Sequence, residues 1–68
     1  MPGTFKLVKI VGTSPAGISE AIKAAVAEAA KTVRQMSWFE VVEQRGRIEG
    51  GEVTEYQVTI QVGFKIDR

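Results

Sequence analysis

Cysteine and histidine are both absent from this chain of 68 residues. No disulfide can form, and a zinc or haem site is disfavoured because the usual side-chain ligands are missing. The same absences remove the thiol nucleophile and the imidazole base on which many enzymes depend. Catalysis by carboxylates, lysine or tyrosine stays open, but these residues form no obvious catalytic pattern.

The chain also has little net charge and no long apolar segment. Its formal net charge is +1 at pH 7, so neither nucleic acid nor an anionic membrane is indicated as a partner. No apolar run approaches the roughly 18 residues that a membrane helix needs, and the first residues lack the apolar core of a signal peptide. We expect a cytoplasmic protein.

A single domain covering residues 1–68 is the largest unit that this length allows. A core of this size rarely contributes more than ~3–5 kcal/mol to stability, so small folds usually need a disulfide, a metal or a partner. Since a disulfide is excluded and a metal disfavoured, we expect the chain to associate with itself.

The hydropathy pattern predicts a β-α-β-β order of elements. Residues 4–12 alternate and are rich in β-branched side chains, as in a strand, and residues 12–15 form a turn signal that ends in proline. A helix follows Gly17, with an apolar stripe at helical spacing made of Ile18, Ile22, Val26, Ala29 and Val33. The predicted fold class is α+β, a three-stranded antiparallel sheet with one amphipathic helix packed on one face.

Residues 36–64 read as one long β-hairpin, because Gly50 and Gly51 can adopt the positive φ angles of a tight turn. With these two residues as the loop, Trp38 lies opposite Gly63 and Gln57 lies opposite Gln44. Alternate residues of the last strand form the core face, namely Thr54, Tyr56, Val58, Ile60, Val62, Phe64 and Ile66. Pairing adds Phe39 and Val41 to this core face.

The same register places Trp38 on the opposite side of the sheet, together with Gln57 and Gln44. The face of an indole can stack on a flat, electron-poor ring. A glutamine amide offers a donor and an acceptor side by side, which complements an imide-like edge such as the pyrimidine end of an isoalloxazine. Taken alone, this pair does not distinguish a ligand site from ordinary packing and solvation.

Four stretches occur in order along the chain: "KIVGTSP", "ISEAI", "WFEVVEQRGRI" and "GGEVTEYQVTIQVGFKI". Together they resemble the dodecins, a family of small flavin-binding proteins, over nearly the whole chain. The family's tryptophan at the start of the second strand matches Trp38. Its arginine-glycine pair and its Tyr-Gln-Val triplet match the dipeptide 45–46 and the tripeptide 56–58. The chain departs from the family at Gly17, where many relatives carry a serine helix cap.

The resemblance implies a hollow homododecamer built from trimers, in which flavins bind in pairs between tryptophans of two subunits. It implies that Trp38 stacks on the isoalloxazine and that Gln57 binds its pyrimidine edge. Such a protein would store or sequester flavin and quench its photochemistry. FMN is the favoured ligand, riboflavin and FAD are the alternatives, and coenzyme A is a candidate second ligand.

Arg45 and Arg47 are our own candidates for contacting a phosphate-bearing ligand tail, because a guanidinium group suits phosphate. Solvated charges or ion pairs between subunits would explain these two arginines equally well. In the predicted register, Trp38 and Gln57 are separated by about 20 Å along the strands. One subunit could not easily hold a single ring with both side chains, so the site should combine two chains.

Two other functions stay open at this stage. One is a purely structural or interaction module, whose aromatic patch joins subunits. The other is an oxidoreductase that uses a bound flavin. Flavin uptake separates the structural reading from the others, and reduction of bound flavin by NADH would identify an enzyme.

Overall fold

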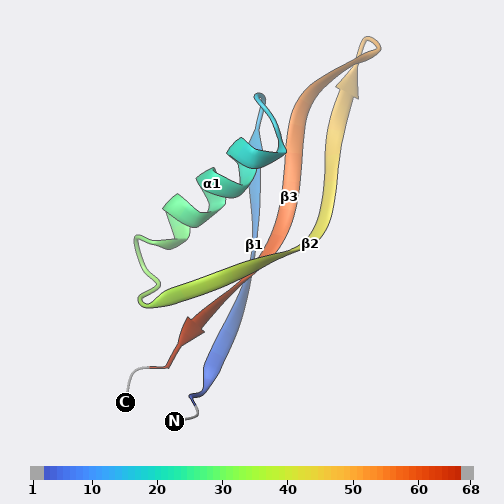
Figure 1. Cartoon of the computed structure of the whole chain (residues 1–68). Coiled ribbons are helices and arrows are strands. Elements are labelled where there is room, and N and C mark those ends of the chain that lie inside the picture. Colours follow the sequence, from blue (N-terminus) through green and yellow to red (C-terminus); the bar gives the residue numbers. More distant parts are fainter. Residues whose placement is uncertain (1–2, 67–68) are drawn as a thin grey trace.

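The computed structural model describes residues 3–66, which form one strand, one helix and a long hairpin (Figure 1). The elements are β1 (Phe5–Ser14), α1 (Ile18–Ala29), β2 (Met36–Glu49) and β3 (Glu52–Lys65). Both strand pairs are antiparallel and the strand order is β1-β3-β2, so the last strand is the central one. The predicted β-α-β-β fold with one helix on one face of the sheet is confirmed.

The core lies between α1 and the central strand. Val58, Ile60 and Val62 of β3 are buried, and they pack with Ala21 and Ala25 of α1. The predicted core face of the last strand is therefore confirmed at its centre. Within residues 3–66, no helix has the length and apolar character that crossing a membrane requires.

β1 extends further than predicted and includes Gly12, Thr13 and Ser14 of the expected turn, whereas Pro15 lies beyond the end of the strand. Gly12 is buried within β1. A Cβ atom there would overlap the backbone carbonyl oxygen of Ala21 and would lie 2.8 Å from Cβ of Ala25. The helix thus approaches β1 so closely at Gly12 that no side chain fits between them.

α1 ends earlier than predicted, at Ala29, so Val33 is not part of its apolar stripe. The amide of Thr32 donates to the carbonyl of Ala29 at 3.1 Å, which is the spacing of a tight 3₁₀ turn. Gln35 then adopts a φ angle of 60°. Its carbonyl accepts a hydrogen bond of 3.1 Å from the amide of Lys65, which holds the chain next to β3 where β2 begins.

The hairpin pairs as predicted next to its turn and again from Trp38 to Val41, whereas a further shift at Ser37 places Met36 opposite Phe64. Gly50 and Gly51 have φ angles of 59° and 80°, as a two-residue turn of this kind requires. At the far end, Trp38 lies opposite Gly63.

The middle of the hairpin is shifted by one residue. Gln57 lies opposite Arg45, and the predicted pairing with Gln44 is wrong. The shift comes from two bulges, since the ladder skips Thr54 in β3 and then Val42 in β2, and the second restores the original register. β2 changes direction in its middle part, at the passage from green to yellow in Figure 1. Gln44 therefore belongs to the helix side of the sheet.

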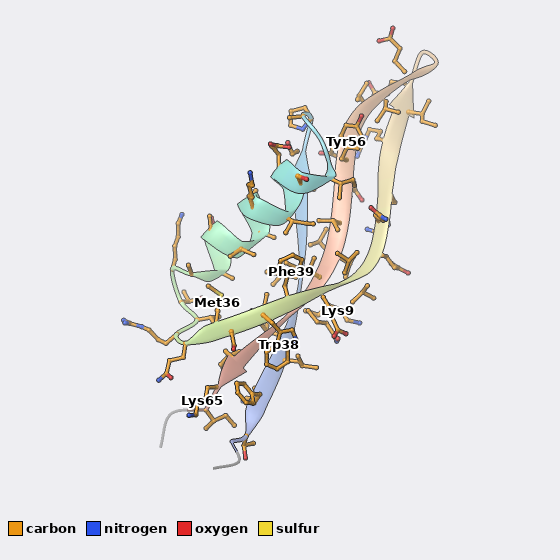
Figure 2. All side chains as sticks on the ribbon, viewed as in Figure 1. Lys9, Met36, Trp38, Phe39, Tyr56 and Lys65 are labelled. Atoms are coloured by element: carbon orange, nitrogen blue, oxygen red, sulfur yellow. The ribbon has the colours of Figure 1, made fainter. Side chains whose placement is uncertain are left out.

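Phe39 and Val41 do not join the core, contrary to the prediction. Both pair with core-face residues of β3, but their exposed fractions are 46% and 44%. The reason is that α1 packs on β1 and β3 rather than on β2. Figure 2 shows Phe39 on the side of β2 that faces the helix, where nothing in the described chain covers the strand completely.

Replacing Gly12 with alanine is expected to lower the free energy of unfolding by about 1–3 kcal/mol, because the new methyl group must push α1 away from β1. Denaturant unfolding at equal protomer concentrations measures this effect, since association changes apparent stability. Gly3→Ala is the control, because a Cβ there meets other atoms only at 3.5 Å or more. Equal unfolding midpoints for the two variants would contradict the close packing at Gly12.

Candidate functional site

The face of the sheet opposite α1, here called the outer face, carries the candidate ligand residues. Val58, Ile60 and Val62 point toward the helix, so the residues between them on β3 point the other way. On β3 the outer face consists of Glu55, Gln57, Thr59, Gln61 and Gly63, with their paired neighbours on β1 and β2.

Trp38 presents its indole on the outer face, away from its own helix (Figure 2). The ring lies over Gly63, where a Cβ atom would overlap the ring carbons Cζ2, Cη2 and Cε2. Phe5 of β1 meets the ring edge-on, with centroids 5.2 Å apart and an angle of 61° between the planes. The indole is still 42% exposed, so it rests on the sheet while part of its surface remains accessible.

The amide of Gln57 is held between two charged side chains of the same subunit. Its Oε1 accepts a hydrogen bond from Nη1 of Arg45 at 3.4 Å, and its Nε2 donates to Oε1 of Glu55 at 3.0 Å. Arg45 also donates to the carboxylate of Glu43 and, at 3.3 Å, to the hydroxyl of Thr59. These five residues form one connected group, which we call the polar network.

Neither candidate arginine stands alone. Arg45 pairs with Glu43, and Nε of Arg47 lies 3.8 Å from Oε1 of Glu55. All four side chains are substantially exposed, and ion pairs in such positions contribute little to stability. Both arginines thus form ion pairs within one chain, whereas the predicted ion pairs between subunits and the phosphate role both stay predictions.

The structure does not bring Trp38 and Gln57 together within one subunit. Trp38 lies opposite Gly63, and Gln57 precedes Gly63 by six positions on β3. This separation corresponds to about 20 Å along the strand. The corrected pairing leaves the predicted separation unchanged, since only the partner of Gln57 on β2 differs.

Sequence reasoning missed the neighbours that hold the two site residues. Gly63 and Phe5 support the indole. The predicted pairing already placed a glycine opposite Trp38, and this glycine indicates space for the ring. Glu55 lies two positions before Gln57 and so shares its face, which also follows from strand alternation. The contact of Gln57 with Arg45 had no such signal, because it depends on the bulges.

Apolar side chains lie exposed on both sides of the sheet. On the outer face, Leu7 and Val11 continue the apolar surface around Phe5 and Trp38. On β2 and the start of β3, the exposed apolar residues are Phe39, Val41, Val42, Ile48 and Val53. Among residues 3–66, no group of three or more histidine, cysteine, aspartate or glutamate side chains is placed to hold a metal ion.

Solved structures of similar proteins share this fold. The crystal structure of the tt0972 protein from Thermus thermophilus matches with a TM-score of 0.94 at 48% identity, over 98% of each chain. A calcium-chelating antigen called calcium dodecin, from Mycobacterium tuberculosis, matches with a TM-score of 0.80 at 29% identity. That match covers 94% of this chain and 91% of the other, and the structure is described as having a novel calcium-binding site.

The sequence comparisons agree with the structural ones. The sequence profile of the Dodecin family matches residues 4–67. A protein named Dodecin from Thermus thermophilus is 49% identical over 67 residues, which is 98% of this chain and 97% of the relative. A profile match over nearly the whole chain, together with a relative of this similarity, shows that the chain belongs to the dodecin family.

Proposed function

We propose that this dodecin binds flavin in order to store it and to suppress its photochemistry, without catalytic turnover. The observation that carries the proposal is the indole of Trp38, which lies on the bare face of the sheet with 42% of its surface exposed. A supported aromatic face of this kind suits stacking on a planar heterocycle. FMN is the proposed ligand, and riboflavin and FAD are the flavins to compare with it.

The residues on the outer face fit the two ends of such a ligand. Trp38 supplies an apolar stacking surface, and Gln57 supplies an amide for the pyrimidine edge. A bound flavin contributes an electron-poor ring that absorbs blue light. The electron-rich indole of Trp38 can give an electron to the excited ring and recover it, which releases the absorbed energy as heat. A ring covered by stacking also leaves little room for a substrate, which is why no turnover is proposed.

We propose that the chain assembles as a homododecamer built from trimers and that each ligand site combines two subunits. The separation of about 20 Å between Trp38 and Gln57 supports a shared site. The exposed apolar residues of β2 support self-association, because monomeric proteins rarely leave such surfaces uncovered. These apolar residues would serve equally in a purely structural oligomer, so flavin uptake is the property that separates the two functions.

Three further parts of the proposal concern the tail of the ligand, a second ligand and the location of the protein. Arg47 is proposed to reach a phosphate tail, although Glu55 competes for its guanidinium group, whereas the contacts of Arg45 with Glu43 and Gln57 support a different role. Coenzyme A is proposed as a second ligand on the family resemblance alone. A cytoplasmic location without nucleic-acid or membrane partners is proposed on the composition of the chain.

Replacing Trp38 with alanine is expected to weaken flavin binding by about 5- to 150-fold, since stacking of one ring on an aromatic side chain is worth about 1–3 kcal/mol. Fluorescence titration with FMN and riboflavin measures the affinity, and light scattering measures the mass of the oligomer. An unchanged affinity in an intact oligomer would remove Trp38 from the site.

Trp38→Phe is the matched control for that experiment. The phenyl ring keeps a stacking surface, so flavin should bind more tightly than in Trp38→Ala. A phenyl ring gives up an electron less readily than an indole, so the bound flavin should fluoresce more brightly than in the wild-type complex. Equal quenching in the two complexes would argue against electron donation by Trp38.

Replacing Gly63 with alanine is expected to weaken flavin binding while the oligomer stays intact. The new methyl group would occupy the space under the indole and tilt the ring off the sheet. Near-ultraviolet circular dichroism reports the change in the surroundings of Trp38, and titration reports the affinity. Gly3→Ala serves again as the control, and a Gly63→Ala protein that binds flavin as tightly as this control would refute the role of Gly63.

Mixed oligomers test whether the site is shared between chains. Trp38→Ala and Gln57→Ala chains, co-expressed with different tags, should recover binding sites of wild-type affinity that neither variant has alone. Recovery is expected because an intact Trp38 on one chain can meet an intact Gln57 on another. Absence of recovery would place both residues in a site within one chain, and full binding by either single variant would remove that residue from the site.

A further inference from the structure

We infer that Arg45 is a positioning residue of the flavin site: it sets the orientation of the Gln57 amide and is not a ligand of a phosphate tail. The inference rests on the proposed function, because it concerns the same site. It starts from the contacts of the polar network, in which Arg45 and Glu55 lie on either side of Gln57.

Only one orientation of the Gln57 amide can form hydrogen bonds with both of its charged neighbours. A guanidinium group can only donate hydrogen bonds, and an ionised carboxylate can only accept them. Oε1 of Gln57 must therefore face Arg45, and Nε2 must face Glu55. Turning the amide over would set its NH₂ group against the guanidinium and its carbonyl against the carboxylate.

Arg45 is itself fixed in place by further partners. Its Nη2 donates both to the carboxylate of Glu43 and to the hydroxyl of Thr59, and Thr59 is only 6% exposed. Because the guanidinium is planar and rigid, holding Nη2 also fixes the direction of Nη1 toward Gln57. The bulges are necessary for this arrangement, since an unbroken ladder would put Gln44 opposite Gln57.

The network uses only half of the hydrogen-bonding capacity of the amide. Oε1 has a second lone pair and Nε2 has a second hydrogen, which remain for a ligand. They offer an acceptor and a donor in a defined order, which matches a ligand edge with an N–H beside a carbonyl, as in an imide. Arg45 thus determines which way round such an edge can bind.

The charges around Arg45 also disfavour the phosphate role. The carboxylate of Glu43 already faces the guanidinium, so a phosphate would have to displace it or bind beside a like charge. An oriented amide needs no such displacement. The positioning role therefore accounts for the contacts of Arg45 with Gln57, Glu43 and Thr59, whereas a phosphate role would not require them.

Titration with riboflavin, which has no phosphate, and with FMN tests the inference. Arg45→Ala is expected to weaken the binding of both ligands by the same factor, about five- to tenfold, as for loss of one or two polar contacts. The double variant Arg45→Ala/Gln57→Ala should bind no more weakly than Gln57→Ala alone, because Arg45 acts through Gln57. Lys31→Ala is the control for loss of one positive charge, since Lys31 pairs with Glu28 on the helix side of the sheet.

Arg45→Lys keeps the charge but loses the planar fork, so it should also weaken riboflavin and FMN alike. It provides the same comparison in case the alanine variant does not assemble. Unchanged riboflavin binding with weakened FMN binding in either variant would overturn the inference in favour of a phosphate contact. Additive losses in the double variant would also overturn it. A wild-type oligomer that binds neither flavin would instead overturn the proposed function.

Discussion

The mismatch in length between the helix and the hairpin determines most of this structure. α1 has 12 residues and is about 18 Å long, whereas β2 and β3 have 14 residues each and extend about 46 Å. One short helix cannot cover such a sheet, and it packs mainly on β1 and β3. The small core and the exposed apolar residues of β2 follow from this mismatch, whereas the outer face is bare because the single helix packs on the other side of the sheet.

Much of the fold could be predicted because its signals are local. Alternation and helical spacing identify the elements, and two adjacent glycines identify the turn. The one-residue shift could not be predicted, because the bulges at Thr54 and Val42 cancel, so the residues next to the turn and those from Trp38 to Val41 keep the expected register. The exposure of Phe39 could not be predicted either. Strand pairing predicts on which side of the sheet Phe39 lies, but whether the helix covers it depends on the length and position of α1.

The surroundings of Trp38 and of Gln57 also differ in how well the sequence predicts them. The two bulges between the turn and Trp38 cancel, so Trp38 keeps the register that the turn predicts and its outward orientation was predicted correctly. The neighbours of Gln57 depend on the shifted middle part, so its contact with Arg45 could not be predicted. Alternation sorts residues into faces only while the ladder is unbroken, and a bulge reassigns every residue after it.

The bulge at Val42 separates the aromatic half of the face from the polar half. Trp38 lies before it on β2 and the polar network lies after it, so the two groups occupy separate parts of one surface. Under the proposed function, a ligand needs the aromatic half of one chain and the amide of another. A ligand that binds only between subunits stabilises the assembled state through mass action. Flavin storage and assembly would then be linked. A single chain leaves its outer face uncovered, and the ligand would bind on this same face between two chains.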